Sequence, residues 1–245
     1  MEDTKHFDQG YKDSMNKILE EAWGHFIEQF TSREIMDSER SLSESMFQFC
    51  FANEILSVGR NHLGQGFNIN LETEWGNLHT KTNRGKNIDI TCHIIKDDKE
   101  EYLCAIELKF KRKRDAKGTF GKDRLFHMYR DIGYLEKEIT PSEAGDDKPT
   151  YSAGRFYFVT NNESYIEKYS KDAVRIDCKK SDIGLNDGFS IKQGKYCLNS
   201  EKEEYVEIAN EYNICWEHRD VSRKKDGPDA SKWHFLEIKI LPRRK

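Results

Sequence analysis

The 245-residue sequence has little proline, no long apolar run and no excess of positive charge. With only four prolines, extended disorder is not expected. No apolar run reaches the roughly 18 residues of a membrane-spanning helix, and the polar start, Met1 to Gly10, does not resemble a signal peptide, so a cytoplasmic protein is expected. The net charge of −4 argues against a protein that coats nucleic acid through bulk positive potential, although one local basic cleft remains compatible with it.

The cysteines show no zinc-binding spacing. None of the six forms a CxxC pair, and no CxxC…HxxxH arrangement occurs. We interpret them as reduced thiols, several of them in the core, as in an intracellular protein. The six are Cys50, Cys92, Cys104, Cys178, Cys197 and Cys215.

The pattern of apolar residues predicts a mixed α/β fold. Hydrophobic residues make up 36% of the chain, which at this length is enough for one core. Apolar residues spaced three and four apart predict helices over about 13–30, from Ser43 onward and over 125–139. Alternating or short, dense apolar runs predict strands over 67–75, 87–95, 101–110 and 155–160, and shorter strands over 205–208, 212–216 and 233–241. We therefore expect a central mixed β-sheet flanked by helices, with a β-rich C-terminal portion.

Two neighbouring strands carry the residues that suggest chemistry. In NIDITCHI, alternation places Asp89 on the face opposite the isoleucines. In YLCAIELKFK, Glu107 and Lys109 share a face, about 6.5–7 Å apart along the strand. The charged turn between the strands, Lys96 to Glu100, is typical of antiparallel neighbours, and such pairing brings Asp89 beside the other two residues.

Two carboxylates beside a lysine suit metal-dependent phosphoryl chemistry. Mg²⁺ takes oxygen ligands, commonly one or two protein carboxylates, and leaves positions for water and phosphate. The metal lowers the pKa of bound water, and a nearby ammonium orients that water and stabilises developing charge. We predict Asp89, Glu107 and the backbone carbonyl of Leu108 as metal ligands, Lys109 as a catalytic residue and Glu44 as a further catalytic carboxylate from a helix. Mn²⁺ is expected to substitute for Mg²⁺.

A basic run follows the triplet Glu107-Leu108-Lys109 almost directly. Lys111, Arg112, Lys113 and Arg114 are predicted to contact the phosphate backbone of a nucleic acid. A solvated loop and a nuclear-localisation signal are the alternatives. We expect Asp131, on the next helix, to form an ion pair with a lysine of this basic loop.

Several further polar or aromatic residues invite a role. Glu74 is interpreted as a carboxylate at a strand edge, and His93 as a structural histidine. Trp216 and Trp233 are expected in the core, although stacking on bases is the alternative. The polar residues at the end of the strand over 155–160 are candidates for a supporting role: Thr160, Asn161 and Asn162.

A Glu-x-Lys triplet alone says little in a chain with 34% charged residues. One alternative is a catalytically inactive module that binds nucleic acid or another partner. Another is a surface ion pair in an unrelated α/β protein, which a separation of Asp89 and Glu107 above about 10 Å would favour, because one metal ion cannot span that gap.

Together, Glu44 in a helix, Asp89 in NIDI and the run IELK (106–109) resemble the PD-(D/E)XK nuclease superfamily. In that comparison Asp89, Glu107 and Lys109 match the motif residues, Glu44 matches a helical glutamate by position alone, and Ile88 replaces the usual proline. The resemblance implies a restriction-endonuclease-like core and Mg²⁺-dependent hydrolysis of phosphodiester bonds. It favours DNA over RNA as the substrate, with a role in restriction or genome defence.

A looser likeness, over about residues 43–241, is to a little-characterised group of bacterial proteins with this core. We divide the chain into an N-terminal helical segment over 1–40, the nuclease core over 41–170 and a β-rich extension over 171–245 packed on the core. Restriction-type enzymes are often dimers, so the analogy suggests a homodimer.

Overall fold

The computed structural model describes residues 3–32, 43–71, 88–96, 99–113, 122–140, 151–167, 169–176, 179–197, 205–221 and 231–243. The helices are α1 (Asp3–Thr31), α2 (Glu44–Leu63), α3 (Lys122–Glu138) and α4 (Ser164–Glu167), with the 3-10 turn η1 (Gly64–Gly66). The first strands are β1 (Phe67–Leu71), β2 (Ile90–Lys96), β3 (Lys99–Lys111), β4 (Ala153–Thr160), β5 (Tyr169–Ile176) and β6 (Lys179–Gly184). The later strands are β7 (Ser190–Ile191), β8 (Gly194–Cys197), β9 (Tyr205–Ile208), β10 (Tyr212–Asn213), β11 (Trp216–Val221) and β12 (Ser231–Ile240).

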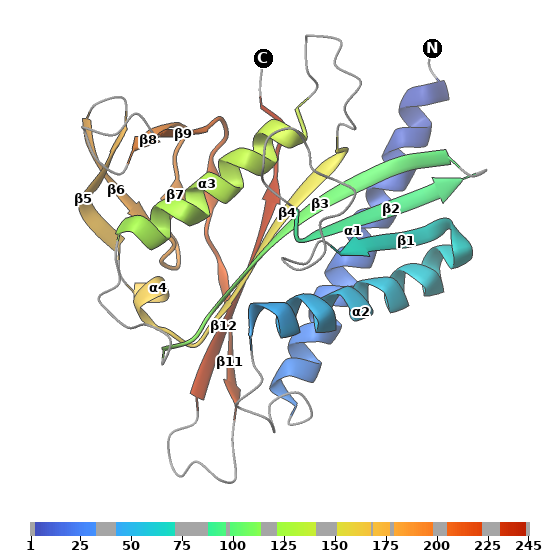
Figure 1. The fold of residues 1–245 in the computed structure, drawn as a ribbon, viewed down its shortest axis with the longest axis horizontal. Helices are drawn as coiled ribbons and strands as arrows, with labels where there is room; N and C mark the ends of the chain where they lie inside the picture. The colour runs from blue at the N-terminus through green and yellow to red at the C-terminus, as the bar shows by residue number, and fades with distance from the viewer. Residues whose placement is uncertain are drawn as a thin grey trace. The chain divides into compact units, whose positions relative to one another are not determined.

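The protein is an α/β protein with a six-stranded mixed central sheet in the order β1-β2-β3-β4-β12-β11 (Figure 1). The C-terminal part adds a four-stranded sheet, β6-β5-β8-β9, and the pair β10-β7. The predicted fold class is therefore confirmed. Contacts divide the chain into two units, unit 1 with residues 1–108 and 148–153, and unit 2 with residues 109–147 and 154–245. The predicted division into three segments stays a prediction.

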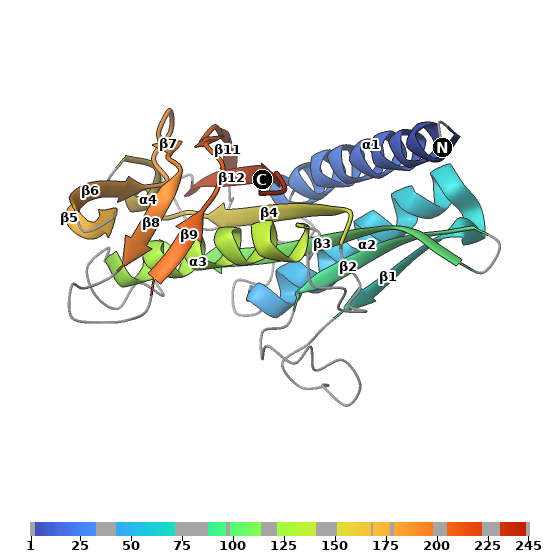
Figure 2. The ribbon, with the colours of Figure 1, turned by 90° about the horizontal axis from the view of Figure 1, so that it is seen from above.

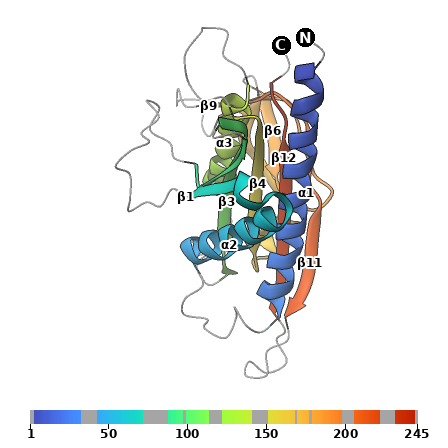
Figure 3. The same ribbon diagram turned by 90° about the vertical axis from the view of Figure 1, so that its right-hand side faces the viewer.

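In unit 1, the helices α1 and α2 cross (Figure 3). Aromatic side chains fill the space between them. Trp23 and Phe26 of α1 pack against Phe47 and Phe51 of α2, with ring centroids 5.0 to 6.2 Å apart between the helices. Ser43 caps α2: its side chain accepts a hydrogen bond from the amide of Met46, which satisfies one of the free N–H groups at the helix start.

The close approach of α2 and β1 depends on a glycine. A Cβ atom at Gly59 would lie 2.1 Å from the ring of Phe67, so no larger residue fits without a shift of the ring or the helix. Strands β1, β2 and β3 then continue as antiparallel neighbours, with Ile90 opposite Ile106 at the end of the β2–β3 register.

In unit 2, α3 packs against the four-stranded sheet, through β5, β6 and β9 (Figure 2). Tyr129 of α3 donates a hydrogen bond to the carbonyl of Gly184, 3.1 Å away, and its ring meets Tyr196 edge-on with centroids 4.8 Å apart. Burial raises the pKa of Tyr129, so this phenol stays neutral and acts as a donor.

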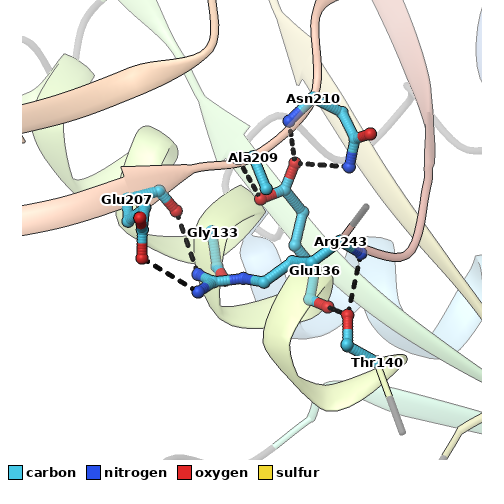
Figure 4. A network of polar contacts seen from close by, with 7 residues as sticks. All are labelled: Gly133, Glu136, Thr140, Glu207, Ala209, Asn210 and Arg243. Carbon is cyan, nitrogen blue, oxygen red and sulfur yellow. Dashed lines mark hydrogen bonds and ion pairs between the residues drawn. The ribbon is translucent and has the colours of Figure 1, made fainter. Parts of the chain in front are cut away.

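A buried glutamate of α3 fastens the chain that connects β9 and β10 (Figure 4). The Glu136 side chain is fully buried, and its carboxylate accepts hydrogen bonds from the amides of Ala209 and Asn210, 2.7 and 3.0 Å away. The side-chain amide of Asn210 and the hydroxyl of Tyr212 also donate to it, at 3.1 and 2.8 Å. These four donors satisfy a carboxylate that would otherwise be costly to bury.

Arg243 fastens the end of the described chain to the same helix (Figure 4). Its guanidinium donates to the carboxylate of Glu207 at 3.1 Å and to the carbonyl of Gly133 at 3.5 Å. Its backbone amide donates to the hydroxyl of Thr140 at 2.8 Å. In unit 2, therefore, residues of α3 form hydrogen bonds with two segments that are distant in sequence: the connection between β9 and β10, and Arg243.

The predicted placement of the cysteines is confirmed in part. Cys92 and Cys104 are buried, Cys50 and Cys197 are half-exposed, and Cys215 is exposed, all as free thiols. Cys178 lies outside the described residues. Among the helices in the described ranges, none combines the length and the apolar character needed to cross a membrane.

Candidate metal centre

The carboxylate of Asp89 lies beside the peptide bond between Glu107 and Leu108. Asp89 immediately precedes β2, and its Oδ2 accepts a hydrogen bond from the amide of Leu108 at 2.7 Å. The Leu108 nitrogen is bonded directly to the carbonyl carbon of Glu107, so Asp89 and Glu107 are neighbours across the β2–β3 pair. Strand β2 begins at Ile90, whereas the predicted strand begins at 87, which lies outside the described residues. The wide separation that would favour an unrelated surface pair is not found.

Glu107 is a buried carboxylate. It is 2% exposed, and its neighbours Ile106 and Leu108 on β3 are fully buried. Burying an ionised side chain costs free energy unless hydrogen bonds or a cation compensate for it. The interpretation of Glu107 as part of a surface ion pair is therefore wrong.

Helix α2 reaches Asp89 through Gln48, a residue that we did not single out in the sequence. The side-chain amide of Gln48 donates to the carbonyl of Asp89 at 2.6 Å. Glu44 lies four residues earlier, which puts both side chains on one face of the helix. The four-residue spacing from Glu44 could have indicated that Gln48 lies on the same side of the helix. Glu44 itself is half-exposed, and its catalytic role stays a prediction.

In unit 2, Lys109 is held by a buried aspartate. The Lys109 Nζ lies 2.9 Å from Oδ2 of Asp131, which is 3% exposed and belongs to α3. We predicted a lysine of the basic loop as the partner of Asp131, whereas the ion pair in the structure is with the lysine of the triplet. Lys109 lies two residues after Glu107 on β3, so strand alternation directs both side chains to one face of the strand.

The basic run begins in an ordered backbone. Lys111 and Arg112 are half-buried and Lys113 is exposed, while Arg114 lies outside the described residues. The hydroxyl of Thr160 donates to the carbonyl of Lys111 at 2.6 Å, and the amide of Lys113 donates to Oδ1 of Asn161 at 2.7 Å.

The histidine and the two tryptophans considered in the sequence are buried. His93 is buried and its Nε2 lies 3.1 Å from the side-chain amide of Asn70. Trp216 and Trp233 are both buried, as expected for core residues. Glu74 lies outside the described residues.

The donor set fits a hard divalent cation of the Mg²⁺ type. Two carboxylates and a backbone carbonyl are oxygen ligands, and Mg²⁺ commonly takes only one or two protein carboxylates. Within the described ranges, no group of three or more His, Cys, Asp and Glu side chains gathers as metal ligands.

Comparison with known proteins identifies no relative. No protein-family model, curated protein or solved structure matches the chain.

Proposed function

We propose that this chain is a Mg²⁺-dependent nuclease of the PD-(D/E)XK type that hydrolyses phosphodiester bonds, in DNA rather than RNA. The observation that carries the proposal is the 2.7 Å hydrogen bond from the amide of Leu108 to the carboxylate of Asp89. It brings the carboxylate of Asp89 next to the peptide that joins Glu107 and Leu108. The buried state of Glu107 gives further support, because a buried carboxylate at this point suits a cation ligand.

Each residue has a distinct role in the proposed reaction. Asp89, Glu107 and the carbonyl of Leu108 would hold the cation, which supplies charge neutralisation and a more acidic water. The Lys109 ammonium orients the attacking water and stabilises negative charge on the phosphate. As the water oxygen bonds to phosphorus, one phosphorus–oxygen ester bond breaks and the leaving oxygen takes up a proton. The ion pair with Asp131 holds the ammonium in place.

A cleavage assay with matched variants tests this function. Supercoiled plasmid, single-stranded DNA and RNA are incubated with the protein in Mg²⁺ or Mn²⁺, and parallel samples contain EDTA. We expect the wild type to cut DNA only with metal and Glu107→Gln to cut at least about 100-fold more slowly, because the amide cannot balance the cation's charge. Glu28→Gln, the same change at an exposed position of α1, is the control and should cut at the wild-type rate.

Two outcomes would count against the proposal. Equal cleavage by the wild type and Glu107→Gln would show that the activity belongs to other residues. Salt-dependent binding of DNA without cleavage in either metal would instead favour the inactive binding module.

A further inference from the structure

Three anchors hold alternate residues from the end of β3 into the basic run, all of them within unit 2. The side chain of Lys109 is bound by Asp131 of α3, at 2.9 Å. The carbonyl of Lys111 accepts from the hydroxyl of Thr160, and the amide of Lys113 donates to the side chain of Asn161. The last two anchors come from adjacent residues at the end of β4.

The segment that carries Thr160 and Asn161 is itself held by hydrogen bonds. Thr160 is fully buried, and its hydroxyl oxygen also accepts a hydrogen bond from the amide of Asn162 at 3.0 Å. Asn162 is buried and its side chain accepts from the amide of Ser164, the first residue of α4, at 3.1 Å. The chain from Thr160 to Ser164 is thus a short, ordered polar turn.

An ordered backbone changes what the basic residues can do. Cations on a flexible loop lose backbone freedom when they bind a phosphate chain, and this loss weakens binding. Over Lys111 to Lys113, the two hydrogen bonds from the end of β4 already fix the backbone before any ligand arrives. The exposed side chain of Lys113 therefore extends from a backbone that is already held in place.

We propose that Thr160 and Asn161 are positioning residues that hold 111–113 as a preformed contact for the phosphate backbone of a nucleic acid. The inference rests on the proposed function for the class of ligand. It assigns to the threonine and asparagine an effect on affinity alone, because neither contributes charge. Lys113 contributes charge and therefore contributes to the salt dependence of binding.

Binding measured over a salt series separates these roles. The probe is a fluorescently labelled DNA duplex, in EDTA so that metal-dependent cleavage does not occur. Thr160→Val and Asn161→Ala should each weaken binding about tenfold, with an unchanged slope of log affinity against log salt. Lys113→Ala should lower the magnitude of that slope by about 0.9, the value for one phosphate contact. Thr31→Val, which removes a hydroxyl that donates to a backbone carbonyl at 2.7 Å in α1, is the control and should bind as the wild type.

Hydrogen exchange at the Lys113 amide shows whether the anchor is released. Faster exchange at this amide in Asn161→Ala together with wild-type affinity would overturn the inference, and so would a reduced slope in either anchor variant. A wild type that does not bind the duplex would overturn it as well. The proposed function is tested separately. If the wild type cuts DNA and the anchor variants bind the duplex as the wild type does, only the positioning role is refuted. If the anchor variants bind more weakly but the wild type does not cut DNA, only the nuclease activity is refuted.

Discussion

Replacing Lys109 with methionine is expected to reduce metal-dependent DNA cleavage by about 10²- to 10³-fold. This is the loss typical when one preorganised group that stabilises transition-state charge is removed. Methionine preserves most of the side-chain length and apolar contact, so the change isolates the ammonium. Cleavage rates measured at saturating Mg²⁺ provide the test, together with thermal unfolding of each variant.

The ion pair with Asp131 makes a control necessary. Lys109→Met leaves a negative charge at a 3% exposed position without the ammonium that lies 2.9 Å away, so the variant should also be less stable. In Lys109→Met/Asp131→Asn the charges balance again, and stability should recover while cleavage stays low. Recovery of cleavage in the double variant would show that Lys109 acts through stability alone.

Replacing Glu136 with glutamine is expected to destabilise unit 2 by about 2–4 kcal/mol. The carboxylate accepts four hydrogen bonds, from two backbone amides, the Asn210 side chain and the Tyr212 hydroxyl. A glutamine can accept only through one oxygen, and its NH₂ group would face donors. Urea denaturation should show a lower midpoint with an unchanged slope.

Hydrogen exchange localises this effect. The amides of Ala209 and Asn210 should exchange faster in Glu136→Gln, because both donate to the lost carboxylate oxygens. Glu28→Gln makes the same chemical change at an exposed helical position and should leave the midpoint unchanged. Unaltered exchange at both amides would contradict the role assigned to Glu136.

Periodicity in the sequence was sufficient to predict the three long helices and the strands β1 to β4, but not the strands between Tyr169 and Cys197 or the start of α1 at Asp3. The apolar spacing from Met15 to Phe30 predicts α1, and the alternation in the two strands around Lys96 predicts the β2–β3 pair, because in both cases burial of one face determines the structure. The sheet order could not be predicted. The position of β4 between β3 and β12 depends on contacts between segments that are distant in the sequence.

The candidate site shows the same limit. Strand parity places Glu107 and Lys109 on one face, and the antiparallel pair brings Asp89 to the Leu108 amide. The partners of Gln48 and Asp131, which are the carbonyl of Asp89 and the side chain of Lys109, could not be predicted, since each depends on where a helix packs. The anchors from Thr160 and Asn161 likewise join residues 48 or more positions apart.

Binding of Mn²⁺, followed by electron paramagnetic resonance, tests the proposed metal centre most directly. The wild type and Lys109→Met are expected to bind one ion each, because the ligands Asp89, Glu107 and the Leu108 carbonyl remain intact. Asp89→Asn can still accept the hydrogen bond from Leu108 but loses its charge, and it should bind Mn²⁺ at least about tenfold more weakly. Equal Mn²⁺ affinity in the wild type and Asp89→Asn, or no binding by the folded wild type, would contradict the metal centre.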